Sequence, residues 1–183
     1  MFSLRFEQLI LALEAAAKAT GKLNFVVLGS AALVGSVENP SEKLTRTVEI
    51  DLYPTPDQKG FDLEQADREI GESSPFHQEN GFYVERLGDW ALSDQPTGWE
   101  ARATEIKIGA ITALCLHPLD LAYNKLNVGR EKDFIYVTGL LREGIIDGKE
   151  FEDFIRLGSP SYCFETNLRK LAQITDSLRE GAS

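Results

Sequence analysis

The sequence predicts an α/β (α+β) fold in which a small mixed sheet is flanked by helices and followed by a helical C-terminal part. A strand, a small-residue turn, a short helix and a second strand follow one another within residues 23–53. After Pro118, apolar residues recur at helical spacing almost to the C-terminus. We expect one domain over 1–183, with a sheet-containing core over 1–115 and a helical part over 116–183.

The N-terminal half supplies the predicted strands, which are recognised by apolar runs or by alternation of apolar and polar residues. Thr20-Gly21 is expected to end the first helix, and Pro54 takes the chain out of the sheet. In chain order we expect a helix over 6–20, a strand over 23–28, a short helix over 31–35, a strand over 45–53, a surface helix over 63–70, and strands over 82–87 and 102–107, with a loop over 88–98 before the last strand.

The C-terminal part is predicted to hold four helices. Pro118 suits a first helical turn, and Asp120 lies where the positive end of the helix dipole favours a carboxylate. Asp147 with Glu150 resembles a capping box, and Gly158 is a helix stop. The expected helices cover residues 118–126, 134–141, 147–157 and 159–178, the last opened by Ser159-Pro160.

The composition limits the possible partners. The formal net charge of −10 argues against a broad nucleic-acid surface, which needs clustered Lys and Arg. A local basic pocket remains compatible with it, although the same residues would also suit solvated helix faces; these basic residues are Lys125, Arg130, Lys132 and Arg142. Charged residues interrupt the apolar N-terminus, so we expect no membrane contact and a cytoplasmic protein.

Two carboxylates occupy alternate positions of the second predicted strand. Glu49 and Asp51 therefore point to one face, while Val48, Ile50 and Leu52 point to the other. Hard oxygen ligands of this kind suit Mg²⁺ or Mn²⁺. An ordinary surface strand opposite a buried face shows the same pattern.

A Gly-Ser turn follows the first predicted strand. Gly29 would let the backbone approach a phosphate without a Cβ clash, and the hydroxyl of Ser30 could donate to it. Gly-Ser is also a common turn dipeptide.

Together, the Gly29-Ser30 turn and the Glu49-x-Asp51 strand resemble the motif of the nucleotidyltransferase superfamily related to DNA polymerase beta. In that superfamily a Gly-Ser or Gly-Gly turn precedes Asp-x-Asp, so Glu49 stands where Asp is more usual. The resemblance implies a third carboxylate on a strand beside the metal-binding one. Glu105 is the candidate, Glu85 is its competitor, and either is also compatible with a surface acid.

A second resemblance lies in the C-terminal half. Residues 119–126 and 129–134 resemble the DLxxxKLxAxRxKD segment of minimal bacterial nucleotidyltransferase-like proteins, a group that includes the AbiEii-type toxins. Residues 71–77, 81–84 and 98–102 are similar to a poorly characterised branch of that group. The resemblance implies that Lys125 neutralises a triphosphate and that Arg130 and Lys132 help to bind the nucleotide. Asp133 would orient Lys125, activate an acceptor hydroxyl, pair with Arg130 or cap the next helix.

The resemblance implies a metal-dependent nucleotidyltransferase that moves a nucleoside monophosphate from an NTP to an RNA, such as tRNA, or to a protein. It also suggests a toxin-antitoxin or defence setting with a cognate toxin or antitoxin as partner. The alternative is a catalytically inactive member that binds nucleotide or a partner protein. Aromatic residues that could stack a base, or simply belong to the core, are Phe76, Tyr83, Trp90 and Trp99.

Overall fold

The computed structural model describes residues 2–55, 62–88, 90–93, 95–158 and 161–180. The chain forms two compact units: unit 1 comprises residues 1–94 and 100–117, and unit 2 comprises residues 95–99 and 118–183. That both units belong to one domain stays a prediction. Among the described residues, no helix combines the length and the apolar character needed to cross a lipid bilayer.

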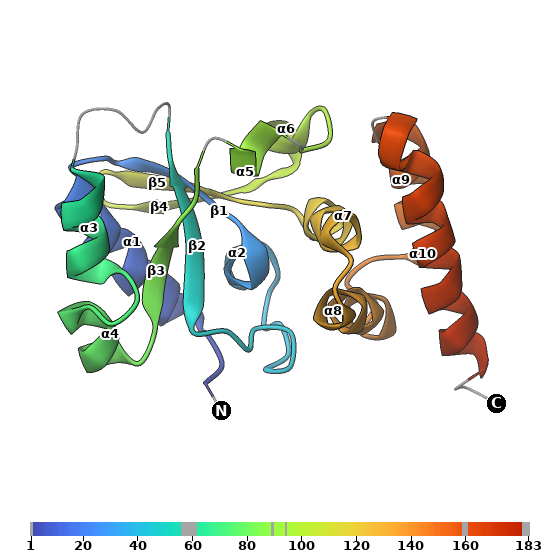
Figure 1. Cartoon of the computed structure of the whole chain (residues 1–183), viewed down its shortest axis with the longest axis horizontal. Coiled ribbons are helices and arrows are strands. Elements are labelled where there is room, and N and C mark those ends of the chain that lie inside the picture. The colour runs from blue at the N-terminus through green and yellow to red at the C-terminus, as the bar shows by residue number, and fades with distance from the viewer. Residues whose placement is uncertain (1, 56–61, 89, 94, 159–160, 181–183) are drawn as a thin grey trace. The chain divides into compact units, whose positions relative to one another are not determined.

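Unit 1 contains a mixed sheet flanked by helices, as the sequence predicts, and this sheet has five strands (Figure 1). The strands lie in the order β3-β2-β1-β5-β4. The pairs β1/β2 and β4/β5 are antiparallel, whereas β1/β5 and β2/β3 are parallel. The strands are β1 (Asn24–Val27), β2 (Glu49–Pro54), β3 (Tyr83–Arg86), β4 (Thr104–Ile108) and β5 (Ile111–Cys115).

Helices of unit 1 connect these strands and cover one face of the sheet. The helices of this part are α1 (Phe6–Thr20), α2 (Gly29–Ser36), α3 (Leu63–Ile70), α4 (Pro75–Asn80) and α5 (Trp90–Ser93), and α6 (Trp99–Arg102) spans the boundary between the units. Residues of α1 and α3 surround a small cavity together with Phe25, Leu52 and Val84 of the strands. That face is therefore the core, and the side chains at alternating positions of β2 and β3 lie on the opposite face.

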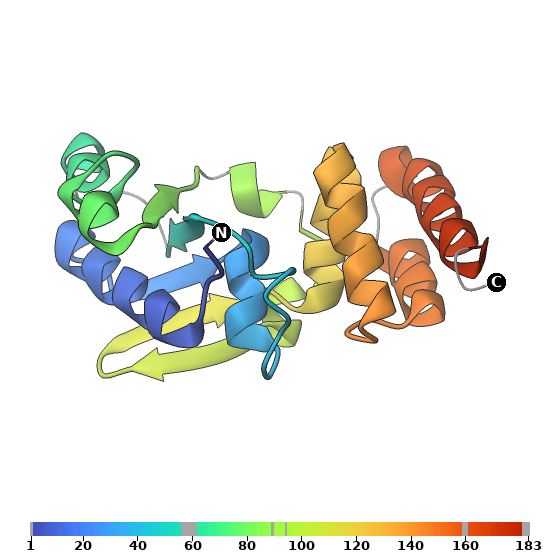
Figure 2. The ribbon, with the colours of Figure 1, turned by 90° about the horizontal axis from the view of Figure 1, so that it is seen from below.

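Three elements of unit 1 differ from the sequence-based expectation. Strand β5 was not predicted, although it lies between β1 and β4 and forms a hairpin with β4 (Figure 2). Helix α4 was also missed, and α5 lies inside the predicted loop over 88–98. Tight hairpins and one-turn helices carry little periodic signal, which explains these misses.

From Pro118 onward, the described residues of unit 2 form four helices, as predicted. They are α7 (Pro118–Val128), α8 (Glu131–Arg142), α9 (Gly148–Gly158) and α10 (Ser161–Glu180). Asn167 of α10, 1% exposed, donates a hydrogen bond to Asn127, and the Lys170 ammonium donates to the carbonyl oxygen of Leu126. Helix α10 therefore satisfies polar groups at the C-terminal end of α7.

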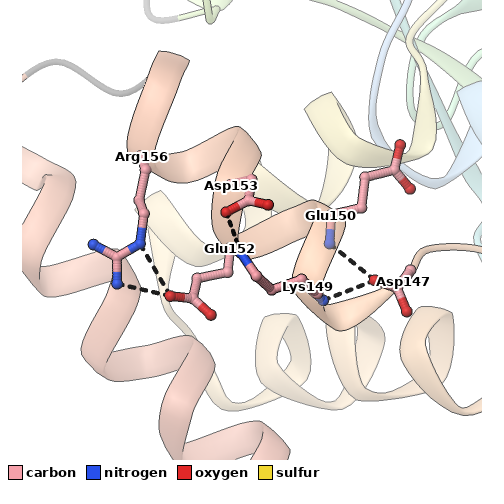
Figure 3. A network of polar contacts seen from close by, with 6 residues as sticks. All are labelled: Asp147, Lys149, Glu150, Glu152, Asp153 and Arg156. Atoms are coloured by element: carbon pink, nitrogen blue, oxygen red, sulfur yellow. Dashed lines mark hydrogen bonds and ion pairs between the residues drawn. The ribbon is translucent and has the colours of Figure 1, made fainter.

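The start of α9 confirms the predicted cap. The Asp147 carboxylate accepts the backbone N–H groups of Lys149 and Glu150, both at 2.9 Å (Figure 3). Along the exposed side of the helix, Lys149 pairs with Asp153, and Arg156 pairs with Glu152. Exposed pairs of this spacing contribute only a few tenths of a kcal/mol each, so the network supports the helix modestly.

Candidate active site

The side chain of Asp51 lies directly against the backbone of Gly29. An ideal Cβ at Gly29 would come within 1.9 Å of the Asp51 Oδ2 atom. Gly29 also has a φ of +57°, in the left-handed region that favours glycine. Two features of the fold make this approach possible: Leu28 N–H donates to the Asp51 carbonyl at 3.0 Å, and α2 begins at Gly29. The glycine is thus needed for the carboxylate itself, a role that the sequence did not suggest.

Glu49 lies two residues before Asp51 on the same face of β2. Its neighbour on β3 is Tyr83, which is 8% exposed. The Tyr83 hydroxyl donates to Glu49 Oε2 at 3.3 Å. Burial, followed by the charge of Glu49, raises the pKa of Tyr83 to about 12, so the phenol keeps its proton and remains a donor.

Glu85 is the carboxylate next to Asp51 on the neighbouring strand. In the parallel β2/β3 pair, Asp51 lies opposite Glu85, as Glu49 lies opposite Tyr83. Burial raises the pKa of Glu85, and the charge of Glu49 raises it further. The same face of the sheet therefore concentrates negative charge on Glu49, Asp51 and Glu85, which we call the carboxylate face.

The expectation that Glu105 lies on a strand beside the Glu49-Asp51 strand is wrong. Glu105 is on β4, and both β1 and β5 separate β4 from β2. Three strand spacings correspond to about 14 Å, too far for a metal ion shared with Asp51. Glu105 instead pairs with Lys107 at 2.7 Å. Its competitor Glu85 occupies the neighbouring strand.

In unit 2, a second charged cluster forms around Asp133 in the first turn of α8. Asp133 is 1% exposed and accepts the backbone N–H of Arg130 at 3.1 Å. The Arg130 guanidinium donates to both of its oxygens, from Nε at 2.8 Å and from Nη2 at 3.2 Å. The Lys125 ammonium lies 3.6 Å from Asp133 Oδ1 and 5.2 Å from the centre of the Tyr136 ring. These residues form the Asp133 cluster.

The electrostatics of the Asp133 cluster indicate that Asp133 holds Arg130 and Lys125 in place rather than transferring a proton. Burial acts to raise the pKa of Asp133, but the hydrogen bonds from Arg130 and the charge of Lys125 outweigh it, and the pKa is lowered. A carboxylate with a lowered pKa is a weak general base. The geometry therefore matches three of the roles open to Asp133: orienting Lys125, pairing with Arg130 and capping α8.

The remaining predicted basic residues are more accessible. Arg130 is 54% exposed at its side chain, and Lys132 and Arg142 are exposed on α8. Lys125 is 19% exposed. Ser30, directly after Gly29 in α2, is half-buried in unit 1.

A search of protein-family models gives one match. The model described as "Nucleotidyltransferase of unknown function (DUF6036)" matches residues 5–146, which is most of the chain. The chain belongs to this family. Searches of curated proteins and of solved structures give no match. The match ends before α9, so the last two helices of this nucleotidyltransferase lie beyond the region that defines the family.

The carboxylate face of this nucleotidyltransferase offers a partial metal site. In the described part of the chain, no group of three His, Cys, Asp or Glu side chains is arranged to hold one metal ion. The donor chemistry nevertheless fits a hard divalent cation, because Glu49 and Asp51 supply carboxylate oxygens from one strand face. The Asp51 carboxylate occupies the space beside Gly29 that a Cβ at this position would take. Glu49 and Asp51 are thus the residues that would hold Mg²⁺ or Mn²⁺.

Of the aromatic residues considered for base stacking, Tyr83 and Trp99 belong to the core, and Phe76 is half-buried. Tyr83 and Trp99 are 8% and 9% exposed, and the Phe76 ring packs edge-on against Phe82 at 5.3 Å between centroids. The side chain of Trp90 lies outside the described residues. The contact of Tyr83 with Glu49 was not found from the sequence, because alternation places Tyr83 and Glu85 on one face but does not tell which strand is next to them.

Proposed function

We propose that this nucleotidyltransferase is an active enzyme that requires Mg²⁺ or Mn²⁺ and transfers a nucleoside monophosphate from an NTP to an acceptor hydroxyl. The observation that carries the proposal is the placement of the Asp51 carboxylate against Gly29 at the start of α2, with Glu49 two residues earlier on the same face. An ordinary surface carboxylate does not require a glycine beside it. A carboxylate that binds a metal ion next to a phosphate-binding turn does require one, because a Cβ in the turn would occupy its place.

The residues of unit 1 have separate roles in this proposal. Glu49 and Asp51 hold the cation, and Glu85 adds negative charge to the same face. Ser30 forms no side-chain hydrogen bond with any described residue, so its hydroxyl is available as a donor to a phosphate oxygen. A bound divalent cation would neutralise charge that builds on the phosphate oxygens during transfer.

For unit 2, the proposed role of the basic residues in nucleotide binding rests on the resemblance of residues 119–134 alone. Arg130 and Lys132 are exposed, as a phosphate ligand must be. Asp133 supports Arg130 by fixing its guanidinium through two side-chain hydrogen bonds, and Lys125, 3.6 Å from Asp133, adds a second positive charge to the cluster.

The proposed acceptor is a hydroxyl of a protein, with an RNA end such as that of tRNA as the second candidate. The net charge of −10 favours the protein, because a long RNA would be repelled. A toxin-antitoxin role is proposed only from the resemblance of residues 119–134 to the AbiEii-type toxins. Expression of the wild type should then arrest growth and Asp51→Asn should not, whereas equal growth of the two strains would contradict the role.

Nucleotide binding tests the proposal directly. Calorimetry with each common NTP should show binding to the wild type that requires Mg²⁺ or Mn²⁺, and Asp51→Asn should remove the metal requirement together with most of the affinity. Ser30→Ala should weaken binding about tenfold to a hundredfold, the effect of one hydrogen bond to a charged group. Glu105→Gln is the matched control, since Glu105 lies on the same sheet three strand positions away from β2, and it should bind like the wild type.

The alternative function, an inactive member that binds a partner, is favoured by one observation. Among the described residues, no third His, Cys, Asp or Glu side chain completes a metal-binding group with Glu49 and Asp51, and Glu49 is already hydrogen-bonded to Tyr83. Transfer of label from an α-labelled NTP to protein or tRNA distinguishes the two. Metal-dependent NTP binding without transfer to either acceptor class would support the inactive member, and absence of NTP binding would refute the enzyme.

A further inference from the structure

The Glu49 carboxylate is hydrogen-bonded to Tyr83. Tyr83 lies opposite Glu49 in the β2/β3 register, is 8% exposed, and donates its hydroxyl proton to Oε2 at 3.3 Å. Within the described part of the chain, no other side chain is hydrogen-bonded to that carboxylate. One oxygen of Glu49 is therefore held by the protein, and the other is left for a ligand.

The Tyr83 ring packs against α4, and the turn that precedes α4 fixes the contacting side chain. The ring of His77 packs against the Tyr83 ring at 4.9 Å between centroids, with the planes inclined by 50°. His77 Nδ1 accepts the backbone N–H of Ser73 at 3.0 Å, which places the proton of the neutral imidazole on Nε2. The backbone N–H of His77 donates to Ser74 Oγ, which caps α4.

The backbone of this turn is strained at one residue. Ser73 has a φ of +64°, a left-handed conformation that a non-glycine residue adopts rarely. The turn supplies the Ser73 N–H that fixes His77, so the strain has a local purpose. Residues 73–77 thus form an outer layer behind Tyr83 and Glu49.

We propose that Tyr83 is a positioning residue for Glu49: it holds one carboxylate oxygen so that the other is presented to a divalent cation, while His77 keeps the Tyr83 ring in place. This inference rests on the proposed function, in which Glu49 is a metal ligand. It also accounts for the departure from Asp at position 49. Glutamate has one more rotatable bond than aspartate, and the hydroxyl of Tyr83 restricts that freedom before the metal arrives.

Glu49 and Tyr83 form a matched pair in this arrangement. Aspartate at position 49 would be shorter by one C–C bond, about 1.5 Å, and its carboxylate would no longer reach the Tyr83 hydroxyl. Glu49→Asp therefore restores the residue usual in the superfamily but loses the tether. The Tyr83 hydroxyl should therefore affect metal affinity when residue 49 is Glu and have little effect on it when residue 49 is Asp.

A double-mutant cycle on the full chain tests the pair. Mn²⁺ affinity would be measured by calorimetry or electron paramagnetic resonance for the wild type, Tyr83→Phe, Glu49→Asp and the double variant. Tyr83→Phe should weaken Mn²⁺ binding about fivefold in the Glu49 background and less than about twofold in the Asp background. Tyr123→Phe is the matched control, because it removes another buried hydroxyl, bonded to Cys163 in unit 2, and should leave the affinity unchanged.

The His77 layer is tested in the same assay. His77→Ala should weaken Mn²⁺ binding in the Glu49 background, and His77→Phe should restore much of it, because an aromatic ring again packs on Tyr83. A thermal melt without metal verifies that each variant folds.

Each outcome decides the inference. Equal losses from Tyr83→Phe in the Glu49 and Asp backgrounds would show a packing role and overturn it, as would no loss in either. A wild type that itself binds no Mn²⁺ would refute the proposed function, and the inference with it. The two failures are distinguishable, because the second is seen in the wild type alone, before any Tyr83 variant is measured.

Discussion

The carboxylate face of unit 1 and the Asp133 cluster of unit 2 surround their carboxylates with opposite kinds of charge. In unit 1, the carboxylate face brings like charges together, and burial with the charge of Glu49 raises the pKa of Glu85. In unit 2, the Asp133 cluster surrounds one buried carboxylate with Arg130 and Lys125, and the pKa of Asp133 is lowered. Folding is opposed by the first arrangement and favoured by the second. Mutual repulsion in a native protein is expected where a ligand relieves it, whereas a buried carboxylate paired with cations of its own unit serves stability.

Removal of the central charge of the Asp133 cluster should have the largest effect on stability. Asp133→Asn keeps the shape of the side chain but loses its charge, leaving Lys125 and Arg130 without their shared partner. We expect a loss of about 2–4 kcal/mol in the free energy of unfolding, measured by urea denaturation. Asp153→Asn is the control: its ion pair with Lys149 is exposed, so the loss should stay below about 1 kcal/mol. Equal losses would contradict a supporting role for Asp133.

The pH dependence of the Asp133→Asn deficit follows from the lowered pKa. A carboxyl with a lowered folded-state pKa contributes stability that is complete above its unfolded value, ordinarily 3.8, and is lost as pH falls through the folded value. The deficit of Asp133→Asn relative to the wild type should therefore be constant from neutral pH to about 5 and shrink below about 4. Denaturation at several pH values measures it, and a deficit that grows on acidification would refute the assignment.

Gly29→Ala should have the next largest effect on stability and the largest on the site. The φ of +57° alone costs about 1–2 kcal/mol for a residue with a Cβ, and that atom would also displace the Asp51 carboxylate. Gly21→Ala isolates the second effect, because Gly21 has a φ of +67° and no atom within 4 Å of the Cβ position. Both variants should be destabilised in melts, but only Gly29→Ala should lose Mn²⁺ and NTP binding. Loss of binding in both would point to general destabilisation.

Glu85→Gln should have the smallest effect, and of the opposite sign. Neutralising one member of the carboxylate face relieves repulsion, so the variant should be slightly more stable than the wild type in EDTA at neutral pH. The gain should stay below about 1 kcal/mol, because Glu85 is exposed and solvent screens the charges. Since the folded-state pKa of Glu85 is raised, the gain should disappear as acidification protonates the wild-type residue toward its ordinary 4.5. A destabilised variant would show that the face is not repulsive.

Local rules account for much of unit 1 and for the helices of unit 2. Alternation along one strand was enough to place Glu49 and Asp51 on one face. The N-terminal cap of α9 at Asp147 and the end of the helix at Gly158 followed in the same way. Prediction failed where the position of a residue depends on another segment. Glu105 was expected on a strand beside β2, but β1 and β5 lie between its strand and β2, and β5 had not been recognised.

The sequence by itself determined the mixed α/β character, the helical C-terminal part and the pairing of Glu49 with Asp51, because these depend on residues a few positions apart. The tertiary structure alone decided the strand order, since the parallel contact of β1 with β5 joins segments from opposite ends of unit 1 and has no local signal. From that order come the exclusion of Glu105, the adjacency of Glu85 to Asp51 and the hydrogen bond of Tyr83 to Glu49. Side-chain direction is a property of one strand, but neighbourhood is a property of the packed sheet.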